Sequence, residues 1–381
     1  MNSLKPHFKK LLVVIKQTAF EEYSQLRLHG KAPKALRWKR LENRYKAHKE
    51  CVNKVVRALG RHHVDFLCVN RAELDRQHLE DVDLVVAVGG DGTVLSSAHF
   101  LDAGTIPLLG VNSDPMTDEQ AASTTTKQTD ERRSHGALCA FSSNDVDGGF
   151  ARVLYGGGNL CRRTRIQCTV KSTYSETRLC PAMNDLLIAH PSPASVSRFR
   201  MGFLVPLQDT SEMEKSSIMK DHDEKIAPEE AAELTASARG DGSSKRVARF
   251  GGTEYGIMRS VNAWSSGIWV CTATGSTAAM AASGGQPMHI DSPQLQYLIR
   301  EHMVEEHVCR EEALERGVGI LQQGGQLHIR WNSASGRIFI DGAHLYHDVV
   351  LGDEILINTL APPLQLFLRE PGEQDFGKPR L

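Results

Sequence analysis

The sequence predicts a two-domain protein with a doubly wound parallel α/β domain at the N-terminus and an antiparallel β-rich domain after it. A chain of 381 residues is long for one domain. Over residues 8–115, short apolar segments alternate with helical ones, which is typical of a parallel sheet. Beyond residue 137, apolar and polar residues alternate with a period of two, which favours half-buried antiparallel strands.

In the first domain we expect four strands and two helices. The helix after the first strand has an amphipathic pattern over residues 33–59 and should stop at Gly60. The second helix follows a glycine-rich segment. The expected strands are residues 11–15, 64–69, 84–88 and 106–111, and the second helix covers residues 96–101.

The second domain, residues 137–357, should contain mostly strands. Asp341-Gly342 lies between two apolar stretches and indicates a hairpin turn, which explains it without a ligand. We expect the tail, residues 358–381, to pack back on the first domain or to trail from it. The expected strands are residues 165–171, 198–205, 268–272, 326–331, 337–340 and 352–359.

Two polar stretches interrupt this pattern. Residues 117–136 are rich in Thr, Gln and charge and predict a mobile loop. Residues 208–246 predict an insertion with disorder, apart from one helix near residues 229–236.

The composition excludes several classes of protein. A formal net charge of −1 indicates no nucleic-acid partner, and no apolar run approaches a membrane span. The eight cysteines form no C-x-x-C pair, which argues against zinc and indicates reduced thiols in an intracellular protein. We expect a cytoplasmic location, with the peroxisome as an alternative because the chain ends in Pro379-Arg380-Leu381.

A glycine loop follows the strand at residues 84–88. Glycines allow tight backbone turns, and the N-terminus of the helix beyond offers N–H groups to a phosphate. A carboxylate at this place repels phosphate unless it has a function. The natural function is that of a general base next to the acceptor hydroxyl. The alternative is a plain Asp-Gly turn. The P-loop and dinucleotide-fold fingerprints are absent from the sequence. The loop residues are Gly89, Gly90, Asp91, Gly92 and Thr93.

Two further motifs carry polar groups beside apolar strands. Asn184-Asp185 precedes Leu186 to Ile188 and could hydrogen-bond ribose hydroxyls or an amide. The stretch 271–279 surrounds a glycine with small hydroxyl residues, which leaves room for a flat ligand. A strand cap and a helix packed through small residues are the structural alternatives.

Taken in order, GGDGT, NDLLI and TATGSTA resemble the NAD kinase family, over roughly residues 80–357. The later FIDG and LGD segments fit the same family. NDLLIAHPSPASVSR and Ser265-Ser266-Gly267 look closest to its plant-type NADH kinase branch.

The resemblance implies ATP-dependent phosphorylation of the 2′-hydroxyl of the adenosine ribose of NADH or NAD⁺, with Mg²⁺, in a cleft between two domains of a homodimer or larger oligomer. Asp91 would accept the proton. The metal ligands stay unassigned. The phosphate-binding residues would be Gly89, Gly90, Gly92, Thr93 and Asn112, and the NAD(H)-binding residues would be Asn184, Asp185, Thr274, Gly275, Ser276, Thr277 and Ala278.

This sequence also departs from the family pattern. Most members carry an acidic residue where Ser266 stands, a Tyr where Ala279 stands and a Ser where Ala282 stands. The element after Asn112 is also missing, because SDPMTDEQ follows. The departures favour NADH as substrate.

Two other functions are open. A lipid kinase of the diacylglycerol or sphingosine type shares the glycine loop, and a non-catalytic NAD(H)-binding regulator would keep the binding motifs.

His190 is expected to be packed or exposed rather than catalytic. Arg162, Arg163 and Arg165 could meet a phosphate, with a solvated strand face as the alternative.

Overall fold

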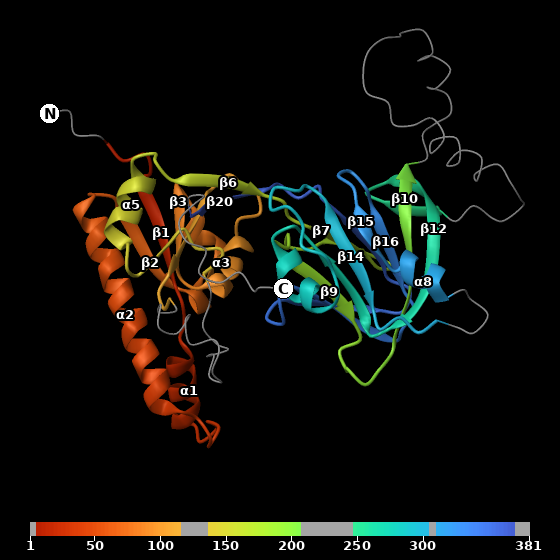
Figure 1. The fold of residues 1–381 in the computed structure, drawn as a ribbon, viewed down its shortest axis with the longest axis horizontal. Helices are drawn as coiled ribbons and strands as arrows, with labels where there is room; N and C mark the ends of the chain where they lie inside the picture. The colour runs from red at the N-terminus through yellow and green to blue at the C-terminus, as the bar shows by residue number, and fades with distance from the viewer. Residues whose placement is uncertain (1–4, 116–135, 207–246, 305–309, 370–381) are drawn as a thin grey trace, which may run out of the picture.

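The computed structural model describes residues 5–115, 136–206, 247–304 and 310–369. They form a parallel α/β domain and a β-rich domain side by side (Figure 1). The chain passes from the first to the second after strand β6 and returns before strand β20. The expected fold class is confirmed.

The sheet of the first domain has the strand order β2-β1-β3-β4-β20-β6, with β5 also paired to β4. All pairs are parallel except β20 with β6. The strands are β1 (Lys10–Ile15), β2 (Asp65–Asn70), β3 (Leu84–Gly89), β4 (Leu108–Asn112), β5 (Phe141–Ser142), β6 (Asn159–Arg163) and β20 (Leu364–Leu368).

Helices cover both faces of this sheet, so it is doubly wound as expected (Figure 1). Helices α2 (Trp38–Arg61) and α5 (Val146–Leu154) pack on one face, and α3 (Asp91–Ala98) packs on the other. In Figure 1, α3 lies on the side of the first domain that faces the β-rich domain.

The helices that precede β4 differ from the expectation in three ways. The predicted helix over residues 33–59 begins later, at Trp38, and continues through Gly60 to Arg61. A separate helix α1 (Ala19–Leu28) precedes it, started by a capping box between Thr18 and Glu21. No residue of α1 is buried, so the sequence carries no apolar face that would reveal it. The helix predicted over residues 96–101 begins at Asp91, within the glycine loop.

The β-rich domain consists of two antiparallel sheets. One has the order β11-β12-β10-β16-β19-β7-β8 and the other β15-β14-β13-β9-β17-β18. The strands are β7 (Gln167–Lys171), β8 (Glu176–Arg178), β9 (Asp185–Ala189), β10 (Ser197–Pro206), β11 (Val247–Phe250), β12 (Thr253–Ser265), β13 (Gly267–Cys271), β14 (Leu295–Arg300), β15 (Val318–Leu321), β16 (Leu327–Trp331), β17 (Ser335–Ile340), β18 (Tyr346–Val350) and β19 (Glu354–Asn358).

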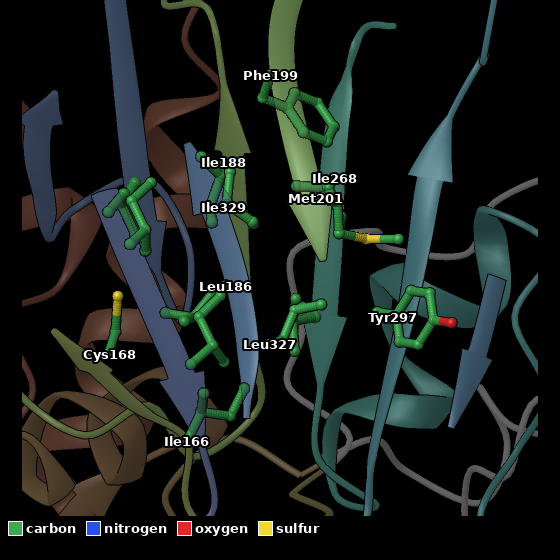
Figure 2. Close-up of a cluster of buried hydrophobic side chains, with 14 of the residues drawn as sticks. Ile166, Cys168, Leu186, Ile188, Phe199, Met201, Ile268, Tyr297, Leu327 and Ile329 are labelled. Atoms are coloured by element: carbon green, nitrogen blue, oxygen red, sulfur yellow. The ribbon is translucent and has the colours of Figure 1, made fainter. Parts of the chain in front are cut away.

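The core of this domain lies between the two sheets. Figure 2 shows Leu186 and Ile188 of β9 near Leu327 and Ile329 of β16. In β17 the burial alternates along the strand, which is the period-two pattern read from the sequence. Each of the six strands expected here is present, with ends shifted by a few residues.

The expected boundary at residue 137 falls too early. Strands β5 and β6 lie in the sheet of the first domain, and α5 packs on it. Strand β20, in the expected C-terminal tail, pairs with β4 and β6 in that sheet. The Asp341-Gly342 turn connects β17 to β18, as expected of a hairpin.

Several expectations fall outside the described residues. These are the polar stretch at 117–135, the insertion at 208–246 with its helix near 229–236, and the C-terminal Pro379-Arg380-Leu381. Within the described ranges, no helix combines the length and apolar character needed to cross a bilayer. The seven cysteines described there are free thiols.

Candidate active site

The glycine loop lies where β3 ends and α3 begins. Gly90 is the N-cap of α3 in an extended conformation, and Asp91 is the first helical residue. A Cβ on Gly89 would lie 2.2 Å from Thr93 Oγ1, so the close packing of the loop on its helix requires glycine there. Thr93 itself is buried, whereas Gly92 is exposed. Thr93 N donates to Gly90 O at 2.8 Å, and the N-terminal end of the helix carries a partial positive charge that favours an anion.

The carboxylate of Asp91 is held by the backbone of a segment 45 residues or more away. Its oxygens accept hydrogen bonds from Gly136 N at 3.2 Å and Leu138 N at 2.8 Å. These bonds orient the side chain at the start of α3. The Asp91 carboxylate is thus fixed beside the N-terminus of α3, which a plain turn would not require.

Asn112 lies beside Gly89, because β4 pairs with β3 in parallel register there. Its side chain is buried and accepts a hydrogen bond from Asp114 N at 3.3 Å. The next residue, Ser113, donates its backbone N–H to Gly89 O at 2.8 Å. The strand end after β4 therefore supports the glycine loop from its side.

Basic side chains gather at the same edge of the sheet. Lys16 directly follows β1 and Arg71 directly follows β2, so both stand at carboxyl ends of parallel strands. Burial lowers the pKa of Lys16, Asp114 opposes this, and the positive charges of Arg44 and Arg71 lower it further. Arg44 Nε lies 3.9 Å from Asp114 Oδ2. These cations create the local positive field that a phosphate-bearing ligand needs, despite the near-zero net charge of the chain.

His48 of α2 is buried behind this edge. Its Nδ1 lies 2.9 Å from Ser113 Oγ. Burial, and then the charge of Lys16, lower the pKa of His48 to about 4, so the ring is neutral at neutral pH. His48 supports the strand end as an uncharged group and adds no charge to the site.

Asn184 and Asp185 lie on a turn whose backbone is held on both sides. Asp341 accepts three successive N–H groups, with Oδ2 at 2.9 Å from Met183 N and Oδ1 at 2.7 Å from Asn184 N and 3.0 Å from Asp185 N. Thr272 holds the carbonyls, because its Oγ1 donates to Met183 O at 2.6 Å and its N–H donates to Asn184 O at 2.9 Å.

The side chains of Asn184 and Asp185 are available for a ligand, because the turn is held through its backbone. Asn184 Oδ1 is buried and has no hydrogen-bond partner in the described part of the chain. Burial, and then the charge of Asp341, raise the pKa of Asp185 to about 7. A buried amide oxygen without a partner and a carboxyl group that titrates near neutrality are features of ligand sites.

The TATGSTA loop packs against this turn. A Cβ on Gly275 would lie 2.1 Å from Asn184 O, so only glycine allows the two loops to approach. Ser276 is buried, donates to Ala273 O at 2.7 Å and accepts from Met288 N at 2.9 Å, so its hydroxyl serves the loop. Thr277 and Ala278 are exposed and Thr274 is half-buried, so these three can face a ligand.

The two sets of site residues are joined through a shared core. Met183, next to Asn184, packs in one buried cluster with Val94 of α3 and with Leu138, whose N–H binds Asp91. In addition, His99 at the C-cap of α3 lies 2.8 Å from Asp341, measured from Nε2 to Oδ2. The Asn-Asp turn and the glycine-loop helix therefore stand against each other across the domain junction.

Two of the three clustered arginines have a role that differs from both expectations, whereas Arg162 is exposed, as the solvated-face alternative expects. Arg165 is fully buried and donates to three backbone carbonyls, those of Pro362, Leu101 and Asp102, at 2.7 to 2.9 Å. Arg163 donates to Ile290 O at 2.8 Å and to the Asp291 carboxylate at 3.1 Å. Arg163 and Arg165 are structural contacts, neither phosphate ligands nor a solvated face.

His190 has structural partners, as expected. Ser192 N donates to its Nδ1 at 3.0 Å, and its Nε2 lies 3.1 Å from Ser335 Oγ. Among the described residues, no group of three or more His, Cys, Asp or Glu could hold a metal ion.

Sequence reasoning missed four residues that shape the site: Lys16, Arg71, His99 and Asp341. Lys16 and Arg71 could have been found, since they lie one and two residues beyond the ends of predicted parallel strands, where ligands gather. Asp341 was assigned to a hairpin turn, which is correct for its backbone. Its partners are 156 to 242 residues away, and no local signal reveals them.

A carboxylate-bearing glycine loop at the carboxyl edge of a parallel sheet, facing a β-rich domain with an Asn-Asp turn, is the site of a nucleotide-dependent phosphotransferase. The model of the ATP-NAD kinase N-terminal domain family matches residues 14–145. The chain is 32% identical over 338 residues to a protein named probable NADH kinase from Oryza sativa subsp. japonica, covering 89% of this chain and 86% of that protein.

A protein named NADH kinase from Arabidopsis thaliana is 32% identical over 364 residues, covering 94% of this chain and 96% of that protein. The crystal structure of yeast NADH kinase complexed with NADH has a TM-score of 0.58 at 14% identity, covering 98% of this chain and 89% of that one. An NAD kinase from Archaeoglobus fulgidus in complex with ATP has a TM-score of 0.54 at 14% identity, with 96% and 95% covered. These two structures share the fold. The chain belongs to the NAD kinase family.

Proposed function

We propose that this enzyme transfers the γ-phosphoryl group of ATP to the 2′-hydroxyl of the adenosine ribose of NADH, NAD⁺ or both. One observation carries the proposal. The turn with Asn184 and Asp185 packs against the helix that begins with the glycine loop, through a core that contains Met183 and Leu138. A dinucleotide held at the turn can present a hydroxyl to a phosphoryl group held at the loop.

The phosphates of ATP would lie at the N-terminus of α3. The loop residues Gly89, Gly90, Gly92 and Thr93 would surround them, with Asn112 supporting the loop. Lys16 and Arg71 at the neighbouring strand ends supply positive charge. Magnesium would arrive with ATP as part of the donor substrate and would neutralise charge on the triphosphate.

Asp91 would act as the general base. As the 2′-oxygen attacks the γ-phosphorus, its proton passes to the Asp91 carboxylate and the bond from the γ-phosphorus to the bridging oxygen breaks, releasing ADP. The hydrogen bonds from Gly136 N and Leu138 N hold the carboxylate in place during this step. Positioning and charge stabilisation by the loop supply most of the remaining rate enhancement.

The dinucleotide would be held by the second domain. Asn184 and Asp185 would hydrogen-bond a ribose or the nicotinamide amide, and the buried Asn184 Oδ1 awaits such a donor. Residues 274–278 would line the adenine end. Within that stretch, the exposed Thr277 and Ala278 and the half-buried Thr274 are placed for contact, whereas Gly275 and Ser276 hold the loop.

A homo-oligomer is part of the proposal. Strands β15 and β18 are the edges of their sheet in the described chain, and both carry exposed apolar residues, including Val318, Ile320 and Val350. Unpaired edges with apolar side chains favour association with another copy. Sedimentation equilibrium should give a mass of at least twice 42.1 kDa. A monomer at micromolar concentration would contradict it.

The test is a direct assay of product. Purified enzyme with Mg-ATP should convert NADH to NADPH or NAD⁺ to NADP⁺, and side-by-side initial rates give the preference. We expect NADH to be favoured. Sphingosine and diacylglycerol are assayed in parallel, and phosphorylation of a lipid alone would support the lipid kinase. Dinucleotide binding without any phosphorylation would support the non-catalytic regulator.

A further inference from the structure

Asp341 connects three parts of the molecule through one buried carboxylate. The side chain is 0% exposed, and both of its oxygens are occupied by two donors each. Its donors are three backbone N–H groups of the Asn-Asp turn and the ring of His99 on α3. A simple hairpin turn requires none of these contacts.

The backbone of Asp341 is also unusual. Its φ is 49°, in the left-handed region that glycine occupies at no steric cost. Glycine at this position would therefore relieve the backbone, yet the next residue is the glycine and position 341 is an aspartate. The turn keeps a strained residue because its side chain serves another element.

Hydrogen bonds from both sides fix the backbone of the Asn-Asp turn. Asp341 binds the N–H groups of residues 183–185, and Thr272 binds the carbonyls of Met183 and Asn184. Only the side chains of Asn184 and Asp185 remain to change partners. The turn is held as a rigid platform for a ligand.

His99 links this platform to the phosphoryl-transfer side. It is the C-cap of α3, whose other end is Asp91, and its ring stacks on His344 from the same hairpin as Asp341. Helix α3 has eight residues and is therefore about 12 Å long. The Asp341 to His99 contact thus ties the two ends of the site together through one short, rigid element.

We propose that Asp341 and His99 are positioning residues: Asp341 orients the Asn184-Asp185 pair for the dinucleotide, and its hydrogen bond with His99 sets the distance of that pair from the glycine loop. The proposal rests on the proposed function. It assigns different kinetic effects to the two residues, because Asp341 acts on the platform itself and His99 acts on its placement.

The first test is Asp341→Asn. Asparagine tolerates the left-handed backbone and has the same shape, but its NH₂ group must face at least one backbone N–H in either orientation. An unsatisfied buried donor should weaken dinucleotide binding by about tenfold or more. The KM for Mg-ATP should change by less than about threefold, since the glycine loop keeps its own contacts.

The second test uses two variants of His99. His99→Leu removes the contact and leaves the Asp341 bonds to the turn, so kcat should fall by about tenfold with a smaller change in the KM for the dinucleotide. His99→Gln keeps a donor that can reach the Asp341 carboxylate, and it should recover most of kcat. Equal loss in both variants would overturn the role of the hydrogen bond.

Asp353→Asn is the matched control. Asp353 is also buried and also caps a turn, where it accepts Val350 N at 2.8 Å, but β19 beyond it belongs to the other sheet. The control should lose thermal stability without a change in KM. If Asp341→Asn lowers stability as Asp353→Asn does and leaves both KM values unchanged, Asp341 is only structural and the proposal is wrong.

Direct binding separates this proposal from the proposed function. Calorimetric titration with NADH and with NAD⁺ measures the platform without any chemistry. If the wild type binds dinucleotide but phosphorylates nothing, the proposed function fails, and weaker binding in Asp341→Asn than in Asp353→Asn still supports the platform. Equal binding in these two variants overturns it.

Discussion

The two sides of the site are built in different ways. On the first side, Gly89 to Thr93 form one continuous stretch in which a strand, a turn and a helix follow each other. On the second side, Asn184 and Asp185 are held by Thr272, Gly275 and Asp341, which lie up to 157 residues away from Asn184. The backbone of the first side is a local motif, although Gly136 and Leu138 hold the Asp91 carboxylate, whereas the second side exists only when strands β9, β13 and β17 have paired in one sheet.

This difference explains which side tolerates change. A contact between near neighbours can relax by a local side-chain movement. A contact between the backbones of two distant loops is fixed by the strands that carry both loops, and those strands pack in a core with little free volume. We therefore expect substitutions on the second side to cause larger losses than substitutions on the first side. Asp91 is the exception on the first side, because its substitution removes the chemistry itself.

The largest effect should come from Asp91→Asn, which keeps size and removes basicity. We expect kcat to fall by a factor on the order of 10² to 10⁴, the usual contribution of a general base. The assay is NADPH or NADP⁺ formation at saturating substrates. A variant within a few-fold of wild type would place the base elsewhere. Asp185, with a pKa raised to about 7, would then be the next carboxyl group to test.

The second effect is the pH dependence of folding stability that arises from Asp185. Its pKa is about 3.8 when unfolded and about 7 when folded, so the folded state binds more protons between these values. The stability that this group contributes is fully present below pH 4 and is lost as the pH rises through 7. The change is on the order of 4 kcal/mol.

Asp185→Asn should remove this dependence. The variant should therefore gain stability relative to wild type at pH 8 and much less at pH 4. Urea unfolding of both proteins at the two pH values gives the difference, and other titrating groups cancel in the comparison. A difference that is the same at pH 4 and pH 8 would show that Asp185 is ionised in the folded protein at both.

The third effect compares two glycines, one on each side. In Gly275→Ala the new Cβ would meet Asn184 O at 2.1 Å and Asn184 C at 2.6 Å, both backbone atoms. In Gly89→Ala it would meet the side chain of Thr93, at 2.2 Å from Oγ1 and 2.8 Å from Cβ. We expect Gly275→Ala to raise the KM for the dinucleotide by about tenfold or more, from a strain of about 1–3 kcal/mol.

Gly89→Ala should act mainly on the KM for ATP, because rotation of Thr93 moves its Oγ1 away but leaves its Cβ at 2.8 Å, so the start of α3 must shift within the phosphate-binding loop. Measuring both KM values in both variants tests the distinction between the two sides. If both variants changed the two KM values equally, the two sides of the site would not be separate, and the distinction would be wrong.

The smallest effect is expected far from the site, at Gly60. A Cβ there meets nothing within 4 Å, and the residue lies inside α2. Gly60→Ala should therefore stabilise the protein by about 0.5–1 kcal/mol through the helix preference of alanine, without a change in kinetics. Thermal unfolding measures the gain. A loss of stability would mean that α2 ends at Gly60 after all.

Much of the fold could be predicted because its signals are local. The period-two alternation at β17 and the apolar run at β3 identify their strands directly. Helix α1 was missed because it buries no residue and shows no apolar face, and the local signal it does carry is the capping box of Thr18 and Glu21. The domain boundary was wrong because the membership of β6 in a sheet depends on its pairing with β20, about 200 residues later in the chain.

By itself, the sequence determined the chemistry of the site: a carboxylate among glycines at a strand-to-helix junction, an Asn-Asp pair and a small-residue loop. These are properties of consecutive residues, whose backbone preferences act over a few bonds. Only the tertiary structure decided that Asp341 and His99 hold the Asn-Asp turn against α3, and that Arg165 binds carbonyls instead of phosphate. A side chain takes its role from the partners that folding brings within hydrogen-bond distance, and those partners are set by strand pairing across the whole chain.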